Sequence, residues 1–165
     1  MTSEHLLHTI PPIYDGNSKI LILGSFPSVK SREVSFYYGH PQNRFWRVLA
    51  AVLGCAEPSS NEEKTALLQS HNIALWDVIK SCDIVGSSDS SIKNVVPNDI
   101  GAILSSCGIR QIYSNGKTSE KLFNKYIKDT VGRDTVALPS TSPANASYNL
   151  ERLTDSWSVI KNNIR

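Results

Sequence analysis

The residues with the most chemical potential lie in three polar segments, each of which follows or contains a turn. The first segment is GSFPS (24–28), in which two serines flank a short turn stiffened by proline. The second is FYYGHPQNRFW (36–46), and the third is LPSTSPAN (138–145). Their hydroxyl and amide groups could hold a phosphate or orient a water molecule, and their aromatic rings could stack on a flat ligand.

The second segment combines several of these possibilities. Tyr37 or Tyr38 could stack on a ligand or pack in the core, and the sequence leaves both options open. Asn43 lies near the expected start of a helix, where its amide could cap that helix or point into a site. Arg44 could contact a phosphate group. The segment therefore predicts a ligand-binding loop that leads into a helix.

Common catalytic and cofactor motifs do not match this chain. GSFPS is neither a G-x-S-x-G nucleophile turn nor a phosphate-binding loop, which needs a terminal Gly-Lys-Ser/Thr. The four histidines show no i, i+4 pair, and the three cysteines form no C-x-x-C pair. We therefore expect neither a metal site nor a cofactor, and we expect the cysteines to be reduced.

The charge of the chain is nearly balanced, with a formal net charge of +2. Basic residues dominate between Lys30 and Arg47, and lysines 117, 121, 125 and 128 would form a stripe on a helix. This stripe is typical of a solvated helix face, although it could also border a phosphate backbone. Net charge alone does not identify a nucleic-acid-binding protein.

Length and hydropathy define the general class of the protein. The 165 residues are expected to form one domain, 1–165, with a substantial core. No apolar run approaches the ~20 residues of a membrane-spanning helix, and the first residues do not resemble a secretory signal. We therefore expect an intracellular, cytoplasmic protein that does not bind membranes and acts as a monomer.

Strand and helix patterns alternate along the chain. Short apolar runs predict strands at 19–24, 73–79, 109–116 and 134–140. Helical periodicity predicts helices at 43–53, 61–70, 97–107, 117–128 and 148–160, whereas the polar segment 82–99 is expected to be a long loop. This alternation predicts the α/β class, with a central, mainly parallel four-stranded sheet in a three-layer α/β/α sandwich.

The expected sheet explains why the polar segments belong together. In open parallel sheets, ligands bind beyond the carboxyl ends of the strands. Loops 24–42, 77–96 and 139–146 all leave the sheet at those ends. The sequence therefore predicts one site built from these three loops.

The order and spacing of LILGSFPS, YYGHPQNRFW, LWDVI and LPSTSPANA resemble the uracil-DNA glycosylase superfamily over nearly the whole chain. Within it, the chain is most similar to the DNA-deoxyinosine (hypoxanthine-DNA) glycosylase branch. Two positions depart from the superfamily pattern. Phe26 stands where many members have Asp or Asn to position the attacking water, and Leu138 stands where several have His or Asn to stabilise the departing base. The resemblance therefore implies catalysis by Asn43, with Ser25 as the second catalytic residue.

The resemblance also implies roles for the remaining site residues. Tyr38 matches the aromatic residue that stacks on the flipped base, with Phe26 in the same base-binding set. Asp77 matches the residue that reads the base edge, although its carboxyl could instead be protonated or hold a neighbouring loop. Ser28 and Ser140 match phosphate-holding positions, and residues 142–146 match the loop that enters the duplex. We expect contacts with the DNA backbone from Ser28, Arg44, Ser140, Ser142 and Asn145.

We therefore expect a monofunctional DNA glycosylase that hydrolyses the N-glycosidic bond of hypoxanthine, in deoxyinosine formed from deaminated adenine, without metal or cofactor. Its partner would be DNA containing deaminated bases. One alternative is a uracil or mismatch glycosylase of the same superfamily. Another is a damaged-DNA-binding module without catalysis, since two familiar polar positions are apolar here. Base excision measured on defined duplexes separates the three.

Overall fold

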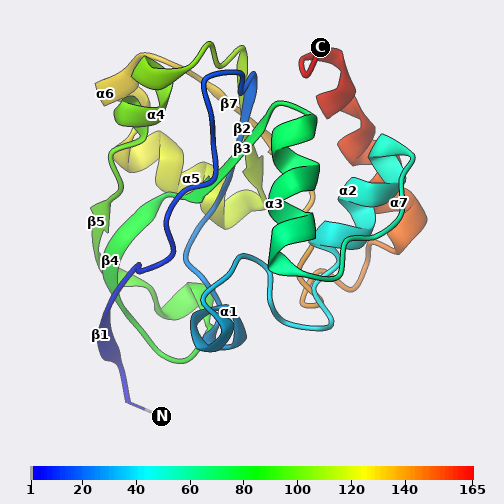
Figure 1. Ribbon diagram of the computed structural model, residues 1–165. Helices are drawn as coiled ribbons and strands as arrows, with labels where there is room; N and C mark the ends of the chain where they lie inside the picture. Colours follow the sequence, from blue (N-terminus) through cyan, green and yellow to red (C-terminus); the bar gives the residue numbers. More distant parts are fainter. Residues whose placement is uncertain (1) are drawn as a thin grey trace.

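The computed structural model describes residues 2–165, which form two β-sheets and seven α-helices (Figure 1). The strands are β1 (Glu4–Leu7), β2 (Ile20–Gly24), β3 (Ile73–Asp77), β4 (Ile79–Ile84), β5 (Lys93–Pro97), β6 (Gln111–Asn115) and β7 (Thr135–Leu138). The α-helices are α1 (Val29–Val34), α2 (Phe45–Leu53), α3 (Asn61–Ser70), α4 (Ile100–Ser106), α5 (Lys117–Tyr126), α6 (Lys128–Val131) and α7 (Leu150–Trp157). Two 3-10 helices, η1 (Asp89–Ser91) and η2 (Ser158–Asn162), complete the chain.

The main sheet has four strands in the order β3-β2-β6-β7, and every neighbouring pair is parallel. Strand β2 lies between β3 and β6, and all five of its residues are buried. A strand covered on both faces needs an apolar residue at every position, which explains why this run does not alternate with polar residues. The predicted α/β class and four-stranded parallel sheet are confirmed.

Helices cover both faces of this sheet, as Figure 1 shows. Successive residues of β2 point to opposite faces, so Ile20 and Ile22 belong to one apolar cluster and Leu21 and Leu23 to the other. The first cluster contains residues from α2, α3, α7 and η2, and the second contains residues from α4 and α5. The result is the predicted three-layer sandwich.

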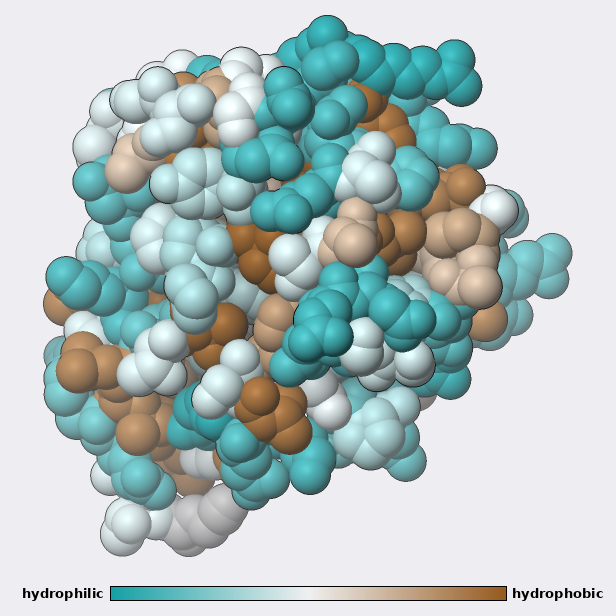
Figure 2. Space-filling model, viewed as in Figure 1, coloured by the Kyte–Doolittle hydropathy of each residue, from teal (hydrophilic) through white to brown (hydrophobic). Residues whose placement is uncertain are grey.

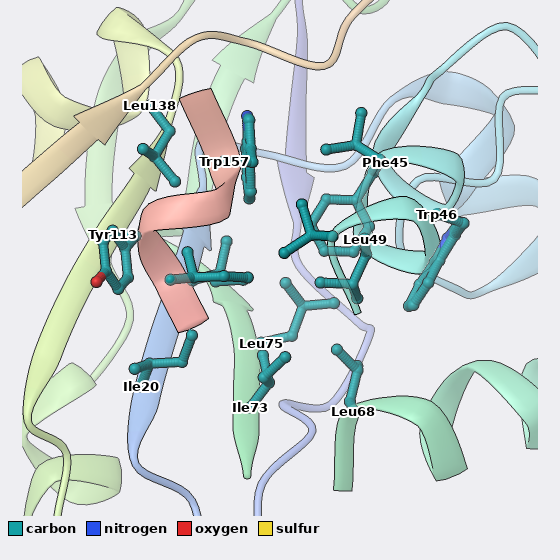
Figure 3. Packing of buried hydrophobic residues seen from close by; sticks show 14 of the residues in the cluster. Ile20, Phe45, Trp46, Leu49, Leu68, Ile73, Leu75, Tyr113, Leu138 and Trp157 are labelled. Carbon is teal, nitrogen blue, oxygen red and sulfur yellow. The ribbon is translucent and has the colours of Figure 1, made fainter. Parts of the chain in front are cut away.

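Trp157 occupies the centre of the larger cluster (Figure 3). Its indole lies between Leu138 at the end of β7 and Phe45 at the start of α2, and it meets the Phe45 ring edge to face at a centroid distance of 5.8 Å. The indole N–H donates to the carbonyl oxygen of Pro139 at 2.9 Å. Helix α7 is therefore joined to the main sheet, to α2 and to the loop after β7.

A second sheet, which the sequence did not predict, has the antiparallel order β1-β4-β5. The prediction of a long loop over 82–99 is therefore wrong for β4 and β5, and only about 85–92 connects them outside the sheet. Four of the six residues of β4 are buried, namely Ile79, Ser81, Cys82 and Ile84. The strand pairs with β1, more than seventy residues earlier in the chain. A partner so distant in sequence leaves no local signal in a polar, serine-rich segment.

Smaller differences concern the ends of helices. The loop expected at 25–42 contains the short helix α1, whose N-cap is Ser28. The helix expected at 117–128 divides into α5 and α6, and the helix expected at 148–160 continues beyond Trp157 as η2. Such shifts fall within the usual uncertainty of helix ends. They do not change the layers.

The molecular surface is mainly hydrophilic on the face shown in Figure 2, with apolar residues in separate groups. Within residues 2–165, no helix combines the length and the apolar character needed to cross a membrane. The cysteines 55, 82 and 107 are free thiols. In this part of the chain, no cluster of three or more His, Cys, Asp or Glu side chains is placed to hold a metal ion.

Replacement of Trp157 by alanine should lower the free energy of unfolding by about 3–5 kcal/mol, because it leaves a large cavity and removes a buried hydrogen bond. Urea denaturation followed by circular dichroism measures this change. Val159→Ala is the control, because Val159 on η2 lies at the surface, 38% exposed, and the smaller side chain should change stability by less than about 0.5 kcal/mol. Equal effects of the two substitutions would contradict the central position of Trp157.

Candidate functional site

A cavity of about 420 Å³ lies beyond the carboxyl ends of the four parallel strands. Gly24 ends β2, Asp77 ends β3 and Asn115 ends β6, and all three line the cavity together with Ser140 from the loop after β7. The cavity is therefore where the topology of the sheet predicts a ligand site, and its volume suits a small organic ligand.

Most of the site residues predicted from the sequence lie around this one cavity. The predicted residues that line it are Ser25, Phe26, Ser28, Tyr38, Asn43, Asp77, Ser140 and Ser142. Arg44 and Asn145 are not part of its lining. Loops far apart in the sequence thus meet, as the sheet topology predicted.

The side chain of Asn43 is fixed in orientation by its neighbours. Its carbonyl oxygen accepts the backbone N–H of Phe45 at 2.9 Å and the hydroxyl of Thr141 at 2.9 Å. Because a backbone N–H can only donate, the carbonyl end of the amide must face α2. Within residues 2–165 no hydrogen bond uses the amide NH₂ group, so Asn43 offers donors, and not an acceptor, to the cavity. Asn43 therefore does both things that the sequence suggested: its carbonyl oxygen contacts the start of α2, and the residue lines the cavity.

A second asparagine holds Thr141 in place. The backbone N–H of Thr141 donates to the Asn115 carbonyl oxygen at 3.0 Å, and the Asn115 amide donates to the Thr141 hydroxyl at 3.0 Å. Thr141 is fully buried. The side-chain hydrogen bonds therefore run from the Asn115 amide through the Thr141 hydroxyl to the Asn43 carbonyl oxygen, while the Thr141 backbone N–H donates back to Asn115.

Tyr38 lies with one face of its ring covered. The ring stacks on Phe45 at a centroid distance of 4.2 Å, and the backbone has a positive φ of 52°, which is uncommon for tyrosine. Its hydroxyl is buried without a hydrogen-bond partner. Burial and the Asp77 carboxylate raise the pKa of Tyr38 above its usual range, so the phenol remains protonated at neutral pH. By contrast, the Tyr37 hydroxyl donates to the carbonyl oxygen of Pro11 at 2.9 Å.

Asp77 is a buried carboxylate that pairs with His8. One carboxylate oxygen, Oδ2, lies 2.8 Å from His8 Nε2, and the two side chains are only 5% and 2% exposed. The other oxygen lies over Gly24, where a Cβ atom would come within 2.4 Å of it. Glycine at position 24 therefore makes room for the carboxylate at the base of the cavity.

Arg44 holds the loop after β7. Its guanidinium donates to the carbonyl oxygens of Ser142 at 2.8 Å, Asn145 at 3.1 Å and Tyr148. Asn145 in turn donates to the carbonyl oxygen of Ser140 at 3.0 Å. These contacts use the donors of Arg44 inside the protein, so a direct role on phosphate, as the sequence predicted, stays a prediction, and the geometry favours support of the loop.

Serine hydroxyls at the rim take part in local turns. Ser28 accepts the backbone N–H of Ser31 at 3.1 Å and caps α1. The Ser140 hydroxyl accepts the backbone N–H of Ser142 at 3.1 Å. The Ser142 hydroxyl accepts the backbone N–H of Ala144 at 3.2 Å. These hydroxyls define the shape of the rim and present oxygen atoms along it.

The rim also carries a second carboxylate, Asp89, on η1. The Ser25 hydroxyl donates to it at 3.4 Å. Although much of Asp89 is exposed, the partial burial of its carboxyl group raises the pKa of Asp89. Asp77 lies at the base of the cavity and Asp89 at its rim, and within the described residues 2–165 no lysine or arginine lines it. The cavity itself therefore disfavours phosphate and suits a flat, uncharged polar ligand.

The residues missed by sequence reasoning include the supporting His8 and the lining residues Asp89, Asn115 and Thr141. Asn115 ends a predicted strand, so its position at the ligand end could have been a signal. His8 belongs to a strand pairing that no local pattern reveals. Asp89 lies in the segment that was expected to be an unassigned loop.

Comparisons with known proteins agree on one group of enzymes. Residues 11–162 match the family model of the uracil DNA glycosylase superfamily. A hypoxanthine DNA glycosylase of Methanosarcina acetivorans is 34% identical over 152 residues, which cover 91% of this chain and 94% of the relative. One of Methanosarcina barkeri is 36% identical over 137 residues, covering 82% and 85%. The solution NMR structure of a candidate uracil DNA glycosylase from Methanosarcina acetivorans superposes with a TM-score of 0.79 at 33% identity, covering 92% of this chain and 94% of that one.

Thr141→Val keeps the shape of the side chain and removes its hydroxyl. We expect the free energy of unfolding to fall by about 1–3 kcal/mol, because Asn115 and Asn43 each lose a buried hydrogen bond. Thr154→Val is the matched control, because its hydroxyl only bonds to the Leu150 carbonyl within α7. Urea unfolding of both variants tests the network, and equal values would mean that the network adds no stability.

Proposed function

Since this chain belongs to the uracil DNA glycosylase superfamily, we propose that it is a monofunctional DNA glycosylase that removes hypoxanthine from DNA. Both relatives described above are hypoxanthine DNA glycosylases, and the chain covers most of their length. The observation that carries the proposal is a cavity with hydrogen-bond donors from Asn43 on one side and the Asp77 carboxylate at its base. A deaminated purine needs both.

The proposed reaction replaces the bond between C1′ of the sugar and N9 of the base by a bond to water oxygen. The base leaves with the electron pair of the broken bond and takes up a proton, while the attacking water loses one. Positive charge develops on the sugar and negative charge on the base in the transition state. Groups that donate hydrogen bonds to the base therefore accelerate the reaction, because they stabilise charge that appears only there.

Asn43 is suited to this task because its carbonyl oxygen is already used. Two donors, from Phe45 and Thr141, occupy that oxygen, so it does not remove a proton from water. Its NH₂ group can donate to an acceptor atom of the departing base or to the oxygen of the attacking water. We assign Asn43 to this role. Ser25, beside Asp89, is the second candidate for holding the water.

The base would enter the cavity after rotation out of the duplex, which costs a few kcal/mol. The free face of Tyr38 can stack on it and recover about 1–3 kcal/mol, while Phe45 supports the other face. Phe26 adds a second aromatic surface, since it lines the cavity and packs edge-on against His8. Asp77 can accept a hydrogen bond from a ring N–H of the base.

The backbone of the DNA would lie across the rim. We assign Ser28, Ser140 and Ser142 to phosphate contacts there, and Arg44 and Asn145 support the loop that carries two of them. An abasic-site lyase forms a Schiff base through an amine. Within the part of the chain that the structure describes, no lysine lines the cavity. We therefore propose hydrolysis alone, by a monomer that acts inside the cell, where its DNA substrate is.

The first test uses duplexes that carry one hypoxanthine, uracil, xanthine or mismatched thymine, followed by alkali to cleave abasic sites. We expect strand cleavage at hypoxanthine after alkali and none without it. Fastest release of uracil or thymine would instead indicate a uracil or mismatch glycosylase. Binding to all duplexes without any abasic site would indicate a damage-binding module and contradict the proposal.

Asn43→Ala should lower the single-turnover rate on hypoxanthine by about 10²–10³-fold, the effect of removing one donor from developing negative charge. Asn43→Asp should be similarly slow, because it keeps the size but replaces the donors by a carboxylate. Asn124→Ala, on the exposed face of α5, is the control and should match the unsubstituted protein. A full rate in Asn43→Ala would exclude the assigned role.

A further inference from the structure

Among the pairs of a basic and an acidic side chain within residues 2–165, His8 and Asp77 form the most deeply buried one. His8 lies just after β1, and its backbone N–H donates to the carbonyl oxygen of Lys80 at 2.7 Å. Its ring is also packed against Phe26 at a centroid distance of 5.9 Å. The imidazole is therefore held in one place by backbone and by packing.

The hydrogen bond between the two side chains has a defined direction. An imidazole is a stronger base than a carboxylate, so the proton that lies between such groups belongs to the ring nitrogen. His8 Nε2 then donates to Asp77 Oδ2, and the carboxylate remains an acceptor at both oxygens. Burial of a carboxylate is costly without such a partner.

The second oxygen of Asp77 remains available to a ligand. No hydrogen bond from residues 2–165 reaches Oδ1, and Asp77 lines the cavity. Strand β2 approaches this oxygen so closely that Gly24 has no room for a Cβ atom. The carboxylate therefore cannot turn freely, and Oδ1 stays directed away from His8.

We propose that His8 is a positioning residue that selects the base, because it holds Asp77 as a hydrogen-bond acceptor for the ring N–H that deamination creates. This inference rests on the proposed function and deepens it. Hypoxanthine carries a hydrogen atom on N1, whereas adenine and unsubstituted purine present a bare acceptor at the same atom. An ionised Asp77 thus attracts the first base and repels the lone pair of the others.

The assignment of His8 as a donor suggests a matched set of variants. His8→Gln retains an N–H donor at a similar distance from the backbone, and His8→Leu removes it while filling the space. The control is His5→Leu, because His5 makes the same kind of contact with Asp83 at 2.7 Å on the same strand pairing, but at the exposed surface. All three should be compared with the unsubstituted protein in thermal unfolding.

The readout is the ratio of single-turnover rates on duplexes that contain hypoxanthine and on duplexes that contain unsubstituted purine. His8→Leu should lower this ratio by about 10-fold or more, the loss expected when one well-placed hydrogen bond no longer discriminates. His8→Gln should keep the ratio within about 3-fold, and His5→Leu should leave it unchanged. A merely structural role of His8 would lower both rates together and leave the ratio intact.

The outcomes separate this inference from the proposed function. If the unsubstituted protein releases no hypoxanthine, the proposed function itself fails. If it releases hypoxanthine but His8→Leu keeps the ratio, the role of His8 is overturned while the function stands. If His8→Leu does not fold, His8→Met, which also lacks a donor, decides: a lowered ratio supports the donor role, and an unchanged ratio contradicts it.

Discussion

The burial of β2 between two strands and two helical layers is the constraint on which the rest of the structure depends. Every side chain of this strand is enclosed, so polar groups can appear only where the strand ends, at Gly24. Since β3, β6 and β7 run parallel to it, their ends meet at the same edge. Four loops that are far apart in the sequence are thereby brought around one cavity. The site is a direct consequence of covering both faces of a parallel sheet.

Two apolar residues at this edge explain how the site differs from the superfamily pattern. Leu138 is buried in the larger core cluster beside Trp157 (Figure 3). Phe26 packs against His8 at the wall of the cavity. Positions that could carry polar catalytic groups are thus used for packing. Donors in the cavity come instead from Asn43, whose amide is oriented through Thr141, and the remaining acceptor is Asp77. The cavity therefore combines neutral amide donors with a single buried carboxylate at its base.

The sequence predicted the parallel sheet, its two helical faces and the meeting of Tyr38, Asn43 and Asp77, because each of these follows from a local pattern and one topological rule. It did not predict the contacts of Arg44 with loop carbonyl oxygens, since an arginine that makes them has the same local appearance as one that binds phosphate. Nor did it predict β1, β4 and β5, whose pairing joins residues far apart in the chain. Contacts of this kind depend on the complete fold.

The antiparallel sheet also changes how the start of the chain should be understood. Strand β1 pairs with β4, and β4 directly follows the strand that ends in Asp77, so the pairing delivers His8 to the base of the cavity. His8 precedes residues 11–162, which are the part that the family model matches. The strand pairing thus brings a residue from before that range to the base of the cavity. If Asp77 reads the base as proposed, β1, whose residues 4–7 do not line the cavity, takes part in base selection through the position of His8.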